Sequence, residues 1–198
     1  MGGQFDVMVP VRVDLSGGWT DVNPYCTDFG GEVINFTINK YVKATVNLLK
    51  EITYDFDIPI GSGLGTSGSV NVARIALLGK DQNLSLDEIA EAAYQAEIKS
   101  GNKCGRQDQW AAKHGGFNHL MFIGDSVEEM PFDPPRSARF WLQKHLIVAN
   151  TGIPHVSGDL HDIIWEKYAA KDEEVIEGLM TIRLAARKMA QGLDQDRR

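Results

Sequence analysis

The stretch DIPIGSGLGTSGSV, residues 57–70, decides how this sequence is interpreted. It places four glycines within the eight residues 61–68, after an alternating segment and before an apolar segment with helical spacing. A glycine-rich turn that leads into a helix directs several backbone N–H groups and the positive end of the helix dipole at one point, which attracts phosphate. Taken alone, a phosphate site and a flexible strand-to-helix turn are equally good interpretations.

The same stretch contains the pattern GxGxxG at residues 63–68, which is typical of dinucleotide-binding enzymes. The preceding strand alternates instead of forming a buried apolar run, and Pro59 separates it from the glycines, so this alternative is disfavoured. The Gly-Lys-Ser/Thr ending of a P-loop is also missing. Thr66 and Ser67 instead supply hydroxyl groups at the start of the helix, where they suit a phosphate or a magnesium ion.

The hydrophobic pattern of the remaining chain predicts an α+β fold, in which strands come first and helices follow. Apolar residues alternate in four early segments, which predict mostly antiparallel strands: 7–16, 32–38, 41–48 and 51–58. Two later segments also predict strands: 117–122 and 144–152. Helical spacing predicts four helices: 66–79, 83–101, 159–168 and 173–193. The second helix contains a capping box, formed by Ser85 and Glu88.

Composition and charge limit the classes of function. With 20 basic and 27 acidic side chains among 198 residues, the net charge is 20 − 27 = −7, which argues against nucleic acid and anionic membranes as partners. Cys26 and Cys104 lack zinc-type spacing and are interpreted as reduced thiols, a single disulfide being the alternative. The sequence shows neither a membrane-spanning apolar run nor a leader pattern, so we expect a cytoplasmic protein.

Three further features have ordinary explanations when each is taken alone. Asp108 lies in the polar cluster RQDQ and would cap the following short helix. Glu97 ends an apolar helical stripe, where it either reaches solvent or binds a metal. Arg12 and Asp21 flank a loop in which Trp19 would fill an apolar gap. Together with the glycine-rich stretch, however, these residues supply the anion site, metal ligands, acid and cation that phosphoryl transfer requires.

Three ordered stretches resemble the motifs of the GHMP kinase superfamily: PVRVDLSGGWTD at 10–21, IPIGSGLGTSGS at 58–69 and RQDQWAAKHGGFNHLMF at 106–122. The resemblance extends from about Val9 into the helix after Asp159. Within the superfamily, the chain is most similar to bacterial fucokinases and to the heptose 7-phosphate kinases. Members of both groups phosphorylate the anomeric hydroxyl of a sugar, so an ATP- and magnesium-dependent sugar kinase is implied.

The resemblance also implies a role for each matching residue. Asp108 would accept or orient the proton of the sugar hydroxyl, and Arg12 would pair with Asp108 and stabilise the transferring charge. Ser67 and Glu97 would bind Mg²⁺. The residues implied to contact the sugar or sugar phosphate are Gly17, Trp19 and Asp21. The residues implied to hold ATP are Pro59, Gly61, Ser62, Gly63, Leu64, Gly65, Thr66 and Ser67.

The implied fold combines an N-terminal domain similar to domain 2 of ribosomal protein S5, over residues 1–135, with an incomplete ferredoxin-like C-terminal domain, over residues 136–198. Gly18 and Trp19 replace the Glu-His pair of galactokinases, which disfavours galactose. Thr66 and Gly68 are mild departures from the loop motif.

The chain is also shorter than the superfamily pattern. The connection between segments 41–48 and 51–58 lacks the usual insert, and the third glycine-rich motif is missing. We therefore expect a fragment, or a chain without certain loops, whose C-terminal stripe from Val175 to Leu193 would be exposed by truncation. A sugar sensor without turnover is the alternative function, and a homodimer is an alternative to a monomer.

Overall fold

The computed structural model describes residues 5–47, 49–152 and 157–197. The chain divides into two compact units: unit 1 contains residues 1–13 and 37–116, and unit 2 contains residues 14–36 and 117–198. Strands β1 (Phe5–Ser16) and β2 (Gly31–Val46) contribute to both units. Mixed strands and helices confirm the α+β class. The predicted domain boundary between residues 135 and 136 falls inside unit 2 and stays a prediction.

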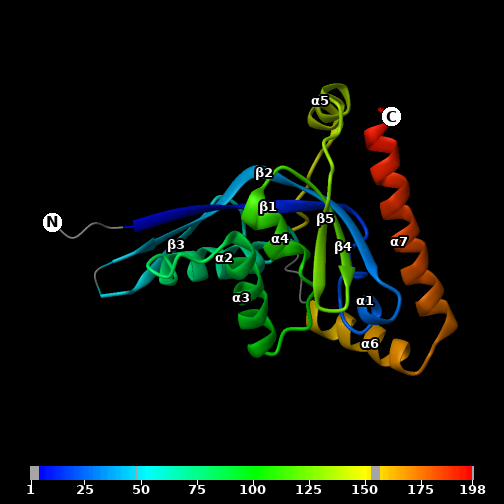
Figure 1. Ribbon diagram of the computed structural model, residues 1–198, viewed down its shortest axis with the longest axis horizontal. Helices are drawn as coiled ribbons and strands as arrows, with labels where there is room; N and C mark the ends of the chain where they lie inside the picture. Colours follow the sequence, from blue (N-terminus) through cyan, green and yellow to red (C-terminus); the bar gives the residue numbers. More distant parts are fainter. Residues whose placement is uncertain (1–4, 48, 153–156, 198) are drawn as a thin grey trace. The chain divides into compact units, whose positions relative to one another are not determined.

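In unit 1, three helices lie on one face of the strands (Figure 1): α2 (Thr66–Leu78), α3 (Leu86–Lys99) and α4 (Gln107–His114). Strand β3 (Ile52–Phe56) pairs antiparallel with the second half of β2, from Val42 opposite Phe56 to Val46 opposite Ile52. The alternating apolar residues of the strands therefore meet the apolar faces of the helices. The buried core consists of Val9, Ala44, Val46, Val72, Ala73, Leu77, Ala93 and Ala112.

Two corrections concern the strands. The predicted strands 32–38 and 41–48 are one continuous strand, β2, because the intervening Asn39 and Lys40 include neither Gly nor Pro to break it. Strand β5 (Ser126–Met130) was not predicted. It pairs with β4 (Phe117–Ile123) through a two-residue turn, in which Gly124 has a φ of 58°. Positive φ is what tight hairpin turns require, so the Gly-Asp pair was an available signal.

Unit 2 places four helices around the first half of β2 and around β4: α1 (Tyr25–Asp28), α5 (Arg136–His145), α6 (Ser157–Ala169) and α7 (Glu173–Asp194). Here β2 pairs antiparallel with β4, from Gly31 opposite Phe122 to Phe36 opposite Phe117. Helix α7 runs beside β2 (Figure 1) and packs on it through a buried cluster: Ile34, Ala138, Ala186, Ala190 and Leu193. A second cluster joins α1, α6 and α7: Val22, Tyr25, Trp165, Tyr168 and Leu179.

These two clusters cover most of the apolar stripe on α7. Leu179, Ala186 and Leu193 are buried, whereas Ile182 is 37% exposed. The expectation that truncation would expose the stripe from residue 175 to residue 193 is therefore wrong for most of its members. Unit 2 covers this helix with its own strands and helices.

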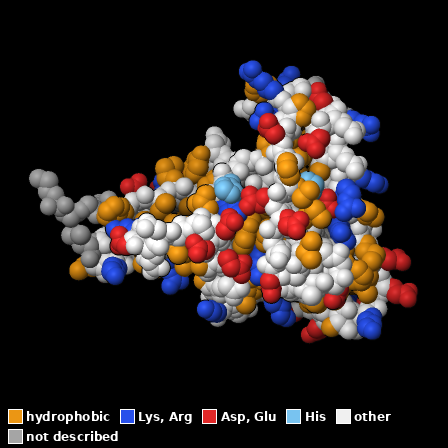
Figure 2. Space-filling model, viewed as in Figure 1, with side chains coloured by type: hydrophobic (Ala, Val, Ile, Leu, Met, Phe, Trp, Pro, Cys, Tyr) orange, Lys and Arg blue, Asp and Glu red, His pale blue; other side chains and the backbone are white. Residues whose placement is uncertain are grey.

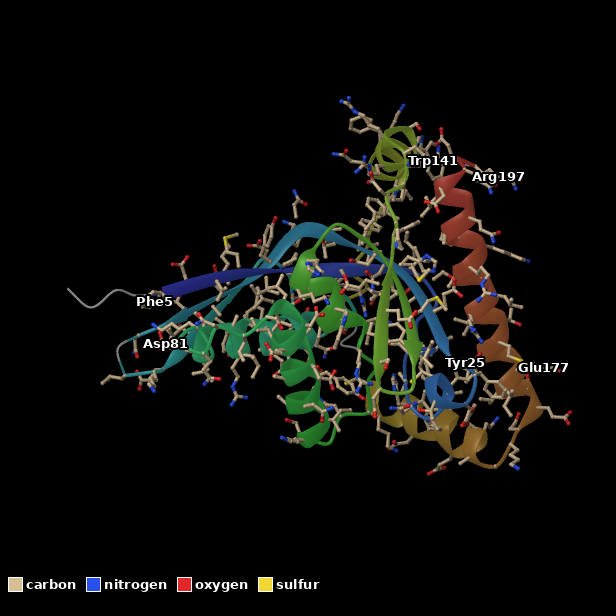
Figure 3. All side chains as sticks on the ribbon, viewed as in Figure 1. Phe5, Tyr25, Asp81, Trp141, Glu177 and Arg197 are labelled. Carbon is tan, nitrogen blue, oxygen red and sulfur yellow. The ribbon has the colours of Figure 1, made fainter. Side chains whose placement is uncertain are left out.

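The predicted strand at residues 144–152 is wrong. Its first two residues end α5, on which Trp141 lies (Figure 3), and residues 146–150 have no regular secondary structure. An apolar segment becomes a strand only when a neighbour accepts its backbone hydrogen bonds. Among the described strands none pairs with this segment, and Ile147 is 87% exposed.

Three features bear on the expectations from composition: the surface charge, the cysteines and the apolar character of the helices. Acidic and basic side chains are interspersed on the face drawn in Figure 2. Cys26 is buried, Cys104 is partly exposed, and the two are not joined by a disulfide, which confirms the interpretation as reduced thiols. None of the helices in the described ranges combines the length and apolar character needed to cross a membrane.

Candidate active site

The glycine-rich loop joins β3 to the first turn of α2, and it contains all eight residues expected to hold ATP. Gly61, Gly63 and Gly65 have φ values of 77°, 76° and 73°, in the left-handed region that favours glycine. Gly65 is the cap residue of α2 and has no side chain to accept the N–H groups of the first turn. The hydroxyl oxygens of Ser62 and Thr66 are buried without a hydrogen-bond partner among the described residues. The loop therefore offers several donors to an anion.

Arg12 connects this loop to Asp108. The guanidinium of Arg12 binds Oδ1 of Asp108, with Nε at 2.8 Å and Nη2 at 2.7 Å. Its Nη1 donates to the carbonyl oxygen of Gly63 at 2.8 Å, and its backbone N–H donates to the carbonyl oxygen of Leu64 at 3.0 Å. One arginine on β1 therefore fixes both the loop and the carboxylate, and charge-assisted hydrogen bonds of this kind are the strong ones.

Asp108 lies directly against the first turn of α2. A Cβ atom at Gly65 would lie 3.0 Å from the carboxyl carbon of Asp108, and one at Gly68 would lie 2.5 Å from the Cβ of Asp108. Glycine at position 68 is therefore a requirement of this contact. Asp108 is the second residue of α4, whose cap residue is Arg106, so the interpretation of Asp108 as a helix cap is wrong.

Glu97 lies near the end of α3, where its side chain is buried. It is 7% exposed, so it does not reach solvent. Ser67 Oγ donates to its Oε1 at 2.5 Å, and Gln109 Nε2 donates to its Oε2 at 2.7 Å. Burial is the largest effect on the pKa of Glu97 and raises it above the ordinary 4.5; the charge of Asp108 raises it further, while both hydrogen bonds lower it. The carboxylate is thus held by neutral donors.

The position of α4 depends on Arg106, which is 2% exposed. Its guanidinium binds both carboxylate oxygens of Glu91 on α3, at 2.9 and 3.1 Å, and lies 4.1 Å from the ring centroid of Tyr94. A bidentate pair combined with a cation–π contact orients the start of α4. Asp108 and Gln109 lie two and three residues after Arg106 on the same short helix, so this anchor helps to set the direction of both side chains.

The residues expected to contact the sugar belong to unit 2. A Cβ at Gly17 would lie 2.1 Å from the carbonyl oxygen of Glu32, so close backbone packing explains this glycine. Asp21 is buried, at 3% exposed. Trp19 has a φ of 79°, which is unusual for a bulky residue, and its ring stacks on His161 at 4.2 Å between centroids. The sugar-binding role of Gly17, Trp19 and Asp21 stays a prediction.

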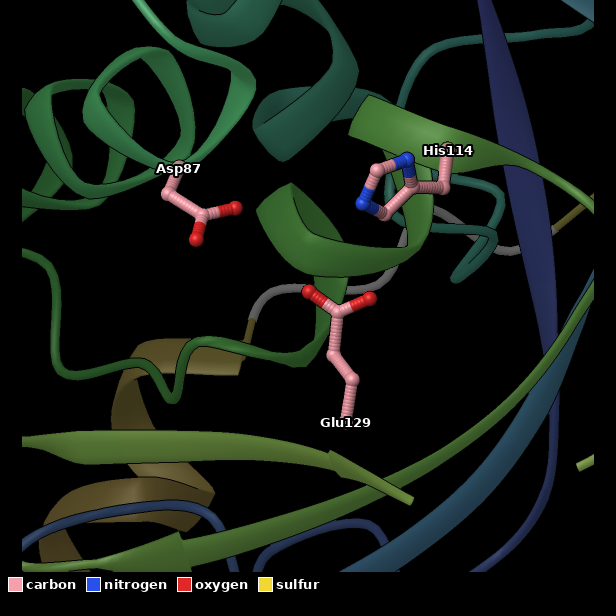
Figure 4. Close-up of side chains that lie close together, drawn as sticks. All are labelled: Asp87, His114 and Glu129. Carbon is pink, nitrogen blue, oxygen red and sulfur yellow. The ribbon is translucent and has the colours of Figure 1, made fainter. Parts of the chain in front are cut away.

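A second group of polar residues in unit 1 lies at the start of α3 and the end of α4. Asp87 and His114, drawn in Figure 4, are both exposed, and their nearest polar atoms lie within 4.8 Å. The Asp87 carboxylate accepts a hydrogen bond from the buried ammonium group of Lys113. This arrangement attaches the start of α3 to the end of α4.

Two residues that shape these regions were not predicted from the sequence. Gln109 was noticed only as part of the polar cluster around Asp108, although it binds Glu97. Thr20 was not singled out, although its buried hydroxyl donates to the carbonyl oxygen of Gly17 at 2.7 Å and accepts from the N–H of Glu32 at 3.0 Å. In the sequence, these two residues are distinguished only by their neighbours: Gln109 follows Asp108, and Thr20 lies between Trp19 and Asp21.

Comparisons with known proteins agree with this geometry. Residues 34–116 match the family model of the GHMP kinases N terminal domain. The chain is 28% identical over 241 aligned residues to the D-glycero-alpha-D-manno-heptose 7-phosphate kinase of Campylobacter jejuni, covering 93% of the chain and 70% of that protein. Because the alignment is longer than 198 residues, that protein has internal segments without a counterpart here. Similarity to the L-fucokinase/L-fucose-1-P guanylyltransferase of Bacteroides fragilis, 38% identity over 53 residues, covers 27% of the chain and 6% of that protein.

A solved structure extends the comparison to the fold. The D-glycero-D-manno-heptose 1-phosphate kinase of Bacteroides thetaiotaomicron superposes with a TM-score of 0.72 at 22% identity, over 97% of this chain and 74% of that one. This likeness concerns the fold alone. The chain therefore carries a GHMP kinases N-terminal domain at residues 34–116 and is similar to a heptose 7-phosphate kinase over most of its length.

Proposed function

We propose that this protein is a kinase that transfers the γ-phosphoryl group of ATP to a hydroxyl group of a sugar or sugar phosphate. The observation that supports it most is the contact of Asp108 with the glycine-rich loop, fixed by Arg12. A carboxylate at the N-terminus of a helix that offers N–H groups to phosphate is placed to act on a hydroxyl beside that phosphate.

In this proposal, different residues bind the phosphates, accept the proton and stabilise the developing charge. Backbone N–H groups of the loop and the hydroxyls of Ser62 and Thr66 bind the phosphate oxygens of ATP. Asp108 orients the sugar hydroxyl and accepts its proton. The hydroxyl oxygen attacks the γ-phosphorus, the bond from the γ-phosphorus to the bridging oxygen breaks, and ADP leaves. Arg12 holds Asp108 in place and stabilises the developing charge.

Ser67 and Glu97 would hold a magnesium ion. Their oxygen atoms lie 2.5 Å apart, and hydroxyl and carboxylate oxygens are the hard ligands that Mg²⁺ prefers. The second negative charge of Asp108 near Glu97 also suits a divalent cation. When bound, Mg²⁺ neutralises charge on the phosphate oxygens.

We further propose that the acceptor is the anomeric hydroxyl of a heptose 7-phosphate. The support for this substrate is the similarity of the chain to the Campylobacter heptose 7-phosphate kinase over 93% of its length. The fucokinase similarity covers a much smaller part of the chain, so fucose is the weaker candidate. Asp21 and Trp19 in unit 2 would contact the sugar.

The test is a screen for ADP release with heptose 7-phosphate, fucose, mannose and galactose. We expect turnover with heptose 7-phosphate and little with galactose. Asp108→Asn should reduce turnover by about 10²- to 10⁴-fold, the usual contribution of a positioned acid or base, while ATP binding is retained. Wild-type turnover in this variant would overturn the role of Asp108. Binding of sugar and ATP by the wild-type protein without ADP release would instead support a sensor.

A further inference from the structure

Gln109 is one of the most deeply buried polar side chains of unit 1, at 1% exposed. Its Nε2 donates to Oε2 of Glu97 at 2.7 Å. Its own Oε1 is buried and has no hydrogen-bond partner among the described residues. The amide nitrogen therefore donates to Glu97, whereas the amide oxygen has no partner among the described residues.

The donor end of the amide decides how Glu97 is held. Oε1 of Glu97 accepts from Ser67, and Oε2 accepts from Gln109, so the two bonds fix both the rotation and the position of the carboxylate. Asn71 also faces this carboxylate, and Asp108 adds a negative charge to its surroundings. If the amide of Gln109 were reversed, its oxygen would face the carboxylate and repel it. The observed orientation therefore keeps Oε1 of Glu97 next to Ser67 Oγ.

The unpartnered oxygen of Gln109 argues against a purely structural role. A buried acceptor without a donor is destabilising, and a leucine or methionine of similar size would avoid that penalty. Violations of this kind are expected where function requires them. Gln109 also follows Asp108 directly on α4, so the same short helix carries the acid and the residue that orients Glu97.

We propose that Gln109 is a positioning residue that orients Glu97 for binding a divalent cation, an inference that rests on the proposed kinase function. In this proposal Gln109 acts through the Glu97 carboxylate, to which its Nε2 donates. Partners that orient a metal ligand in this way typically contribute 10- to 100-fold to metal affinity.

The test measures binding of Mn²⁺, as a spectroscopic probe for the Mg²⁺ site, in the presence of a non-hydrolysable ATP analogue. Gln109→Met removes the amide at similar size, and we expect its Kd for Mn²⁺ to rise by about tenfold. Its KM for Mg²⁺ in the ADP-release assay should rise in parallel. Adding Gln109→Met to Glu97→Gln should cause little further loss, because the first residue acts through the second.

Gln95→Met is the matched control. Gln95 is exposed and donates from Nε2 to Glu91 at 2.8 Å, so this variant also removes a hydrogen bond between glutamine and glutamate in the same unit. We expect wild-type Mn²⁺ affinity. Gln109→Asn, whose amide is one methylene too short to reach Glu97, is the second variant if Gln109→Met does not fold.

The outcomes separate this inference from the proposed function. Wild-type Mn²⁺ affinity in either folded Gln109 variant, or full additivity with Glu97→Gln, overturns the role of Gln109. A wild-type protein that binds neither Mn²⁺ nor the ATP analogue overturns the proposed function itself.

Discussion

Two buried glutamates, one in each unit, have side-chain partners of opposite kinds. Glu32 in unit 2 is 2% exposed, and Glu97 in unit 1 is 7% exposed. Glu32 is paired with cationic or potentially cationic groups: Arg187 Nη2 lies at 2.9 Å and His119 Nε2 at 3.0 Å. Glu97 is held by neutral donors, with a second carboxylate nearby.

This difference in partners indicates a structural role for Glu32 and a metal-binding role for Glu97. A buried carboxylate that is neutralised by an arginine joins structural elements, here β2 and α7. A buried carboxylate without such a partner pays for desolvation and retains its attraction for a cation. This contrast supports Glu97 as a metal ligand in the proposed kinase and predicts that the two sites respond differently to substitution.

The largest effect on stability is expected for Arg187→Met. This variant leaves the carboxylate of Glu32 buried with less positive charge, and because the Arg187 side chain is itself 47% exposed, the loss is limited to about 2 kcal/mol of unfolding free energy. Urea denaturation measures the loss. Arg183→Met is the matched control on the same helix, because Arg183 binds the neutral carbonyl of Phe29. Equal losses in the two variants would contradict an ionic role for Glu32.

Glu97→Gln should show the reverse pattern. Removing a buried charge offsets the altered hydrogen bonds, so the unfolding free energy should stay within about 1 kcal/mol of wild type. Affinity for Mn²⁺ with a non-hydrolysable ATP analogue should fall by about 100-fold, which is about 2.7 kcal/mol. Glu32→Gln should leave Mn²⁺ affinity unchanged. A large loss of stability without a loss of Mn²⁺ affinity in Glu97→Gln would make Glu97 structural too.

Ser67→Ala removes the other proposed ligand while Gln109 still holds Glu97. We expect a smaller loss, about tenfold in Mn²⁺ affinity or about 1.4 kcal/mol. Ser69→Ala is the control two residues along α2: Ser69 Oγ donates to the carbonyl oxygen of Pro10 at 2.8 Å, so its loss should cost about 1 kcal/mol of stability and no Mn²⁺ affinity. Equal Mn²⁺ binding in the two alanine variants would remove Ser67 from the site.

The helices that contain short sequence motifs were predicted correctly. Helical spacing and the capping box at Ser85 located α2 and α3 correctly, because local propensity is readable along the chain. The pairing of Arg12 with Asp108 was implied by the resemblance to the GHMP kinases, and the structure contains it.

The features that were missed depend on contacts between distant segments. The bond from Gln109 to Glu97 joins two helices, and the requirement for glycine at position 68 appears only when α4 packs against α2. The predicted strand at 144–152 failed for the same reason, because apolar alternation does not reveal whether a partner strand is available.

Asp87 is a third carboxylate, which is exposed, unlike those of Glu32 and Glu97. Its substitution is expected to change stability the least. Its hydrogen bond from Lys113 lowers the pKa of Asp87 below the ordinary 3.8. A lowered pKa in the folded state means that the stabilisation is complete above pH 5 and is lost as the pH falls below about 4. Because the Asp87 side chain is 72% exposed, solvent limits this contribution to about 0.5 kcal/mol.

Asp87→Asn, which removes this charge, should therefore differ from wild type by that amount in urea denaturation at pH 6, and the difference should vanish at pH 2.5. A difference that is independent of pH would mean that Asp87 contributes through its shape or helix capping and not through its charge.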